Sequence, residues 1–227
     1  MLRILPFFLA LSLAGSAALA QTAAAGTIQA TGTASLSVQP DQVQLTVSVV
    51  TQANTAAQAG QQNAAQTNAM ITALNQVLGK SGTLQTTGYS IYPRYSNVPG
   101  QTSTIVGYTA QNTLLATAYD LTLSGPLIDA ANQAGASTVS GLTFGLQDPE
   151  PSRLQALTQA GKIAQSHASA IAAGLGAKAG SVLSAVEGST GSIVPVFSGV
   201  GASSSTPVIS GTVTVSATVT ITVQLLQ

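Results

Sequence analysis

Residues 27–51 read TIQATGTASLSVQPDQVQLTVSVVT, and this stretch decides the fold. Apolar side chains alternate with polar ones in two runs, and the parity of the alternation changes at Pro40-Asp41. Because successive side chains of a strand point to opposite faces, each run predicts a half-buried strand. The Pro-Asp pair favours a turn between the two strands. The apolar sets are Ile28, Ala30, Ala34, Leu36 and Val38 in the first run, and Val43, Leu45, Val47 and Val49 in the second.

The next apolar residues recur at helical spacing. A helix is expected from Ala53 to Leu78, ending at Gly79, and another is expected after Asp148-Pro149, because Asp and Pro are typical of helix starts. Each helix should bury one apolar stripe. The expected stripes are Ala53, Ala57, Gly60, Ala64, Ile71, Leu74 and Leu78 in the first helix, and Leu154, Leu157, Gly161, Ala164, Ala168 and Ile171 in the second.

Shorter runs complete the pattern. Mixed strands and helices with several hairpins predict an α+β fold, with a mostly antiparallel sheet and helices packed on one face. A strand, helix and hairpin occur in the same order on both sides of about residue 120, which suggests an internal duplication. Further strands are expected at 83–96, 104–118, 139–146, 181–187 and 212–225, a short helix at 126–134, and a Gly- and Ser-rich loop at 188–205.

The first 20 residues have the layout of a secretory signal peptide. Arg3 precedes an apolar run, and small residues close the segment with Ala18-Leu19-Ala20. The apolar run is shorter than the roughly 20 residues that span a bilayer as a helix, so cleavage after Ala20 is favoured over a retained anchor. We therefore expect an exported chain with one domain at 21–227 and no membrane-spanning segment after cleavage. The chain has no cysteine, so neither a disulfide nor a lipid anchor is expected.

Charge is scarce along the whole chain. Charged residues make up 5% of the sequence, against about a quarter in ordinary soluble domains, and six basic residues balance six acidic ones. No basic stripe exists that could displace counterions from phosphates, so nucleic acid is not an expected partner. Little repulsion keeps copies apart, so we expect a homo-oligomer. The sequence identifies no particular envelope protein as a partner.

Reactive side chains are scarce as well. The chain's one histidine, His167, has only Ile and Ala at its helical neighbours i±3 and i±4, which suits an exposed helix residue better than a general base. The acidic residues are scattered except for Asp148 and Glu150, which suit a helix start. The sequence contains no Gly-x-Ser-x-Gly elbow, and its Gly174-Leu175-Gly176 ends a helix rather than beginning one. We therefore expect no catalytic residues, no cofactor and no metal site.

The stretch TTGYSIYPRY, residues 86–95, holds three of the five tyrosines. In a strand, Tyr89 and Ile91 share one face while Tyr92 and Arg94 share the other. Matching the apolar parity of the partner run should bury Tyr89, Ile91 and Tyr108 against the core. Tyr92 and Arg94 then form the one candidate surface patch, and Pro93 should lie at a sheet edge, because it cannot donate a ladder bond.

A set of spaced segments resembles the bacterial SIMPL-domain family. These segments are Gly32-Thr-Ala-Ser-Leu-Ser-Val-Gln-Pro-Asp41, Leu84-Gln-Thr86 with Tyr89-Ser-Ile-Tyr-Pro93, Gly107-Tyr-Thr-Ala-Gln-Asn112, Leu127-Ile-Asp-Ala-Ala131 with Gly135-Ala136, and Pro207-Val-Ile-Ser-Gly211. The resemblance implies an exported protein of the periplasm or cell envelope. Some such proteins are immunogenic, and some are linked to oxidative-stress tolerance. The resemblance supplies no catalytic residue that could be carried over to this chain, and the scarcity of charge departs from typical members.

Three classes of function fit these observations to different degrees. The favoured class is a non-enzymatic envelope protein that acts through surface binding or self-assembly. The alternative is an outer-membrane β-barrel, because the final strand alternates well and exceeds the roughly 9 to 11 residues needed to span. The long helical patterns and the polar Gln227 count against it. A hydrolase with an unrecognised site is the least favoured, because bases are so few.

Overall fold

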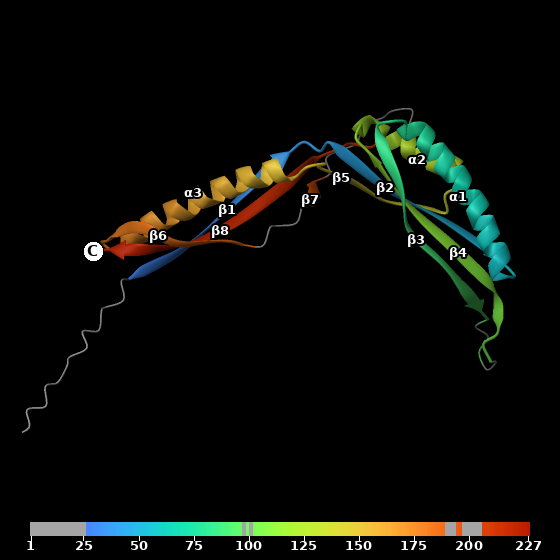
Figure 1. The fold of residues 1–227 in the computed structure, drawn as a ribbon, viewed down its shortest axis with the longest axis horizontal. Helices are drawn as coiled ribbons and strands as arrows, with labels where there is room; N and C mark the ends of the chain where they lie inside the picture. Colours follow the sequence, from blue (N-terminus) through green and yellow to red (C-terminus); the bar gives the residue numbers. More distant parts are fainter. Residues whose placement is uncertain (1–25, 97–98, 100–101, 189–193, 197–205) are drawn as a thin grey trace, which may run out of the picture.

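The computed structural model describes residues 26–96, 99, 102–188, 194–196 and 206–227. The expected signal peptide and most of the expected loop at 188–205 lie outside these residues. The α+β fold is confirmed, but the strands form two antiparallel sheets rather than one, and each sheet carries helices on one face (Figure 1).

The terminal sheet joins the two ends of the chain. Its strand order is β1-β8-β6, and the short β7 pairs with the beginning of β8. Helix α3 covers one face. The bounds are β1 Thr27–Val38, β6 Lys178–Glu187, β7 Val194–Val196, β8 Thr212–Leu226 and α3 Glu150–Gly174.

Strands β1 and β8 pair over twelve residues without a register shift. On the face toward α3, Ile28 lies opposite Val223 and Ala30 opposite Ile221, and these side chains are buried. The opposite face is polar. There a ladder of hydroxyl pairs crosses from β1 to β8: Thr31 with Thr220 at 2.9 Å, Thr33 with Thr218 at 3.1 Å and Ser35 with Ser216 at 2.8 Å.

The fully buried residues of helix α3, which pack on this sheet, are all alanine. Its buried residues step by four, and the expected stripe was wrong in part, because Leu154 and Ile171 are exposed. The reason is a close approach of backbones at Gly32, where an added Cβ would lie 2.1 Å from the Ala160 carbonyl oxygen and 2.4 Å from the Ala164 amide nitrogen. Only methyl groups fit in so narrow a gap. The buried stripe is Ala156, Ala160, Ala164, Ala168 and Ala172.

The central sheet has the strand order β3-β4-β2-β5 and uses only the middle of the chain. Helices α1 and α2 cover one face, and the short 3-10 helix η1 precedes α2. The bounds are β2 Gln42–Ala53, β3 Gly82–Tyr95, β4 Ile105–Ala118, β5 Thr138–Gly145, α1 Ala56–Leu78, η1 Leu121–Leu123 and α2 Ser124–Gln133.

The main core lies between the central sheet and its helices. Val43, Leu45, Val47 and Val49 of β2 are fully or almost fully buried there, as their alternation predicts. The buried face of α1 differs from the expected stripe, because it includes two polar residues. It consists of Ala59, Asn63, Thr67, Met70, Leu74 and Leu78.

The buried Asn63 is satisfied by the sheet. Its amide nitrogen donates to the carbonyl oxygens of Val49, at 2.9 Å, and Ala110, at 3.1 Å, and its amide oxygen accepts from the Thr67 hydroxyl at 3.4 Å. A buried polar group with such partners avoids most of its desolvation cost. Asn63 therefore fixes α1 across β2 and β4.

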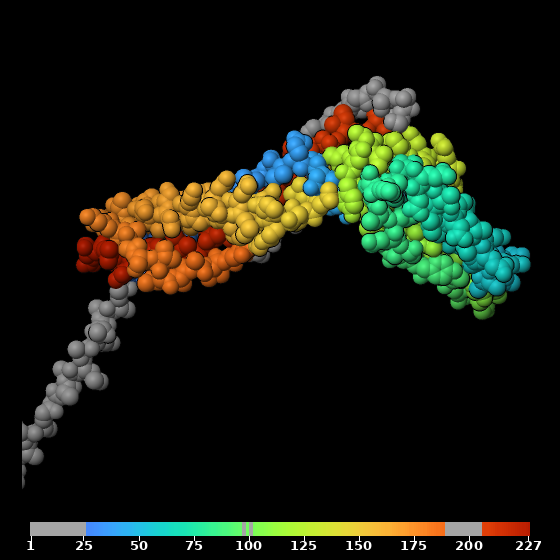
Figure 2. Space-filling model, turned by 45° about the horizontal axis from the view of Figure 1, so that its top comes forward, coloured from blue at the N-terminus to red at the C-terminus, as the bar shows by residue number. Residues whose placement is uncertain are grey.

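The two sheets lie end to end in an elongated molecule (Figures 1 and 2). At their junction the Asp41 carboxylate accepts from the Gln147 backbone amide nitrogen at 2.7 Å. Leu146 packs there with Val213 and Val215. The sequence suggested a duplication with its boundary near residue 120. The two sheets do not divide the chain there, because the terminal sheet pairs β1, which precedes the central sheet in the sequence, with β8, which follows it.

Candidate binding surface

The β3–β4 hairpin forms the outer edge of the central sheet, and Pro93 lies on its edge strand, as expected. The register places Ile91 opposite Ala110, Tyr92 opposite Thr109 and Pro93 opposite Tyr108. Ala110 is a core residue, so Tyr89 and Ile91 share the face that carries α1, whereas Tyr92 and Arg94 share the open face. The expected division of faces is therefore confirmed.

The expected burial on the helix-covered face is wrong. Tyr89 remains 56% exposed and Ile91 39% exposed, and Tyr108 is only half-buried. The α1 residue that faces Tyr89 and Ile91 is Gly60, where an added Cβ would lie 3.3 Å from the Tyr89 hydroxyl and from Ile91 Cδ1. Because Gly60 has no side chain and β3 pairs only with β4, the described residues leave the outer parts of Tyr89 and Ile91 uncovered.

On the open face, Tyr92 and Arg94 are exposed, as expected. The Arg94 guanidinium Nη1 donates to Gln52 Oε1 on β2 at 2.5 Å, which holds this side chain across β4. Neither residue contacts the main core. Their role in binding stays a prediction.

The exposed side chains on both faces near the hairpin tip are together called the hairpin surface. Six large apolar side chains are between 39% and 58% exposed, and Arg94 lies among them. The parity of the two strand faces points only to Tyr92 and Arg94 as exposed residues. The number of bulky residues near the hairpin tip is the sequence feature that indicates the larger exposed set. The hairpin surface consists of Tyr89, Ile91, Tyr92, Arg94, Tyr95, Ile105 and Val106.

The other residues considered from sequence have structural roles. His167 is exposed on α3, and its Nδ1 donates to the carbonyl oxygen of Thr31 at 2.8 Å, so the interpretation as a helix-surface histidine is confirmed. Asp148 accepts from the Glu150 amide nitrogen at 3.0 Å at the beginning of α3, in the helix-start role expected for it. These groups do not converge on one point.

A small charge cluster lies at the same helix start. The Arg153 guanidinium contacts the carboxylates of Glu150 and Glu187. The hydrogen bond from Arg153 lowers the pKa of Glu150, and the same bond raises the pKa of Arg153. All three side chains are partly exposed, which makes the cluster a link between α3 and β6 rather than a buried reactive centre.

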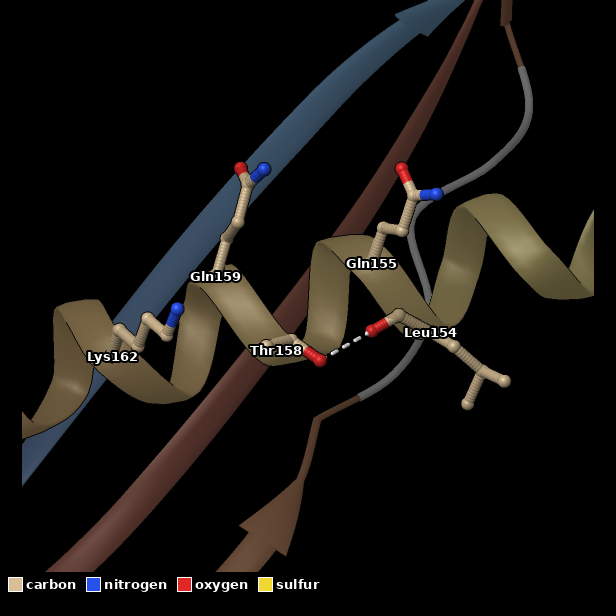
Figure 3. Close-up of a pocket in the computed structure, with 5 residues that line it drawn as sticks. All are labelled: Leu154, Gln155, Thr158, Gln159 and Lys162. Carbon is tan, nitrogen blue, oxygen red and sulfur yellow. Dashed lines mark hydrogen bonds between the residues drawn. The ribbon is translucent and has the colours of Figure 1, made fainter.

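A depression of about 440 Å³ lies along α3 and is shown in Figure 3. It is lined by Leu154, Gln155, Thr158, Gln159 and Lys162, and the Thr158 hydroxyl donates to the Leu154 carbonyl oxygen at 2.9 Å. Its lining thus holds one amine, from Lys162, and one hydroxyl, which is hydrogen-bonded within the helix.

Across the described part of the chain, no three His, Asp or Glu side chains gather as they would around a metal ion. No helix in those residues is long and apolar enough to cross a membrane. A search of curated proteins finds no match to the chain. A family model, SIMPL, described as a protein of unknown function (DUF541), matches residues 28–223. That match covers nearly all of the two-sheet fold and agrees with the resemblance of its spaced segments, and the chain belongs to the SIMPL family.

Proposed function

We propose that this protein is exported to the cell envelope and acts there by binding another protein, not by catalysis. The observation that carries the proposal is the hairpin surface, where six large apolar side chains and one arginine are exposed together. Isolated exposed apolar residues are ordinary, but a group of them on one element marks an interaction site.

The composition of the hairpin surface favours a protein as the partner. Tyrosine and arginine are enriched among the residues that dominate protein interfaces, because each combines a large contact area with polar groups. The only described charge within the surface is Arg94, whose side chain is already held by Gln52. One arginine gives little attraction to an anionic membrane.

Export is proposed from the first 20 residues and from the family resemblance, which also suggests a role in oxidative-stress tolerance. Sequencing the N-terminus of the mature protein tests the first point, and it should begin at Gln21. A mature protein that retains Phe7 and Phe8 would contradict export with cleavage. Survival of a deletion strain under peroxide tests the second point.

Self-association is a further part of the proposal, and the near absence of charge supports it. Sedimentation at increasing protein concentration should show species larger than the monomer. A monomer at the highest concentration would refute this part and leave the hairpin surface untouched.

The hairpin surface is tested with a double variant, Tyr92→Ser with Tyr95→Ser, and a matched control, Tyr119→Ser. Tyr119 is also exposed but follows β4 at the opposite end of the hairpin. The double variant should lose partners captured from envelope extract that the control and the unaltered protein retain, with unchanged melting temperature. Equal capture by all three proteins would refute the proposal. If the unaltered protein and the control bind protein-free phosphatidylcholine vesicles and the double variant does not, the hairpin surface binds lipid instead of protein.

A further inference from the structure

The outer edge of β1 has a defined set of backbone groups that do not bond to β8. The Leu225 amide nitrogen donates to the Gly26 carbonyl oxygen at 2.7 Å, which makes this an exchanging pair of the β1–β8 ladder. Such pairs alternate along an antiparallel ladder, and the register has no shift. Even-numbered residues of β1 therefore bond to β8, and odd-numbered residues from Thr27 to Ser37 point their N–H and C=O groups away from it.

The histidine on α3 supports this assignment. His167 donates to the carbonyl oxygen of Thr31, an odd-numbered residue, so that oxygen is not directed into the ladder. It is the single outward group of β1 for which the described residues supply a hydrogen-bond partner. Ile163 also stands beside the strand, with its Cβ 3.0 Å from the position of an added Cβ on Gly32. The edge is thus bordered by the flank of α3.

The β1 edge also lacks the features that usually protect edge strands. Natural edges carry charges, proline, bulges or very short strands, which prevent pairing with other chains. Strand β3 has Pro93, Arg94 and two register shifts, and β6 has two register shifts and a charge at each end. Strand β5 is short and pairs irregularly. By contrast, β1 has twelve residues, regular pairing and neither charge nor proline.

We propose that the outer edge of β1 binds an extended segment of a partner protein by β-strand addition. In this mode, main-chain hydrogen bonds supply affinity, and alternate side chains supply specificity. The strand already on the other side of β1 indicates which segment fits. Strand β8 places apolar residues toward α3 and hydroxyl residues on the open face, where they pair with Thr31, Thr33 and Ser35. The partner segment should therefore be uncharged and alternate in the same way.

This surface is separate from the hairpin surface, which lies at the end of the other sheet. If strand addition at β1 is refuted, the proposed function of the hairpin surface is unaffected. If the hairpin surface is refuted, the inference about β1 is equally unaffected.

Amide hydrogen exchange tests the inference on the intact mature protein. The probe is a peptide with the sequence of residues 214–224, TVSATVTITVQ, flanked by lysines for solubility. Without the peptide, the amides of Gln29, Thr31, Thr33 and Ser35 should exchange fast, and those of the even-numbered residues between them slowly. The peptide should slow the odd-numbered amides at least tenfold and leave the even-numbered ones unchanged. A peptide of the same composition with the alternation scrambled should have no effect.

Two variants at one position separate the backbone from the side chain. Thr33→Pro removes an outward N–H without removing a main-chain bond to β8, and it should weaken peptide binding at least tenfold. Both Thr33→Pro and Thr33→Val lose the hydroxyl bond to Thr218, so the two variants differ in the N–H. Thr33→Val keeps the N–H and should bind the peptide within about threefold of the unaltered protein. Melting temperatures of both variants are measured, and if Thr33→Pro fails to fold, the exchange pattern of the unaltered protein decides.

Unchanged exchange of the odd-numbered amides at saturating peptide would overturn the inference. Protection of these amides that appears with rising protein concentration and without peptide would also overturn it, because the edge would then belong to a second copy of this chain.

Discussion

Substituting Gly32 by alanine should separate α3 from the terminal sheet. The added Cβ would lie 2.1 Å from the Ala160 carbonyl oxygen and 2.4 Å from the Ala164 amide nitrogen. Both atoms are backbone, so no side-chain rotation relieves the contact. Since favourable heavy-atom separations begin near 3.5 Å, α3 must move by about 1.4 Å.

The size of the effect follows from what that movement exposes. Five alanine methyl groups of α3 are buried against the sheet, and each is worth about 0.8 kcal/mol. If three of them lose contact, unfolding becomes easier by about 2.4 kcal/mol, within the 1–3 kcal/mol typical of overpacking. The matched control is Gly161→Ala on the same helix, where an added Cβ meets no atom within 4 Å. It should stabilise the protein by about 0.5–1 kcal/mol, because alanine is the better helix former.

Urea unfolding followed by two probes makes this prediction specific. The chain has no tryptophan, and its five tyrosines all lie in or directly after β3 and β4. Tyrosine emission therefore reports on the central sheet, whereas far-ultraviolet circular dichroism also reports on α3. Gly32→Ala should shift the circular dichroism midpoint more than the emission midpoint. A midpoint equal to that of the unaltered protein would refute the close approach at Gly32.

Other substitutions test the remaining parts of the structure. Asn63→Ala should destabilise the protein by about 1–3 kcal/mol in urea unfolding, because it removes two buried hydrogen bonds to the sheet and leaves the buried Thr67 hydroxyl without the Asn63 amide oxygen, and the exposed Asn68→Ala should change stability little. Tyr89→Ala should cost about 0.5 kcal/mol, and a loss of several kcal/mol would show that the residue is buried after all. The Thr122 hydroxyl and amide lower the pKa of Asp120 below its ordinary value of 3.8, so the interaction stabilises the fold above that pH and is lost as the pH falls through the folded pKa. Thr122→Val should raise the pKa of Asp120 in an NMR titration, and an unchanged pKa would mean that the hydroxyl bond is absent.

The strands could be predicted because their signal is local. In β2 the apolar residues Val43, Leu45, Val47 and Val49 occupy every second position, and all four are buried as this alternation requires. The pairing of β1 with β8 could not be predicted in the same way. It joins residues almost a whole chain apart, and no local pattern distinguishes it from pairing with the neighbouring β2. For this reason the sequence indicated one sheet where the protein has two.

The helix faces were harder to predict, because α1 buries polar residues and α3 exposes apolar ones. Asn63 and Thr67 are polar but buried, since the backbone of the sheet and their own hydrogen bond satisfy them. Leu154 and Ile171 are apolar but exposed, since Gly32 draws α3 so close that only alanine fits beneath it. A prediction that buries every apolar residue and exposes every polar one therefore places all four of these residues on the wrong face of their helix.

The two surfaces proposed for binding have one property in common, which is the near absence of charge. The hairpin surface holds a single arginine already engaged with Gln52, and the β1 edge offers backbone groups between uncharged side chains. Attraction between exposed charges weakens as salt shortens the screening length, whereas apolar contact and main-chain hydrogen bonds do not depend on it. Binding at either surface should therefore persist at high ionic strength. A partner that dissociates on adding salt must use some other part of the molecule, and the Arg153 cluster between α3 and β6 would then be the first place to look.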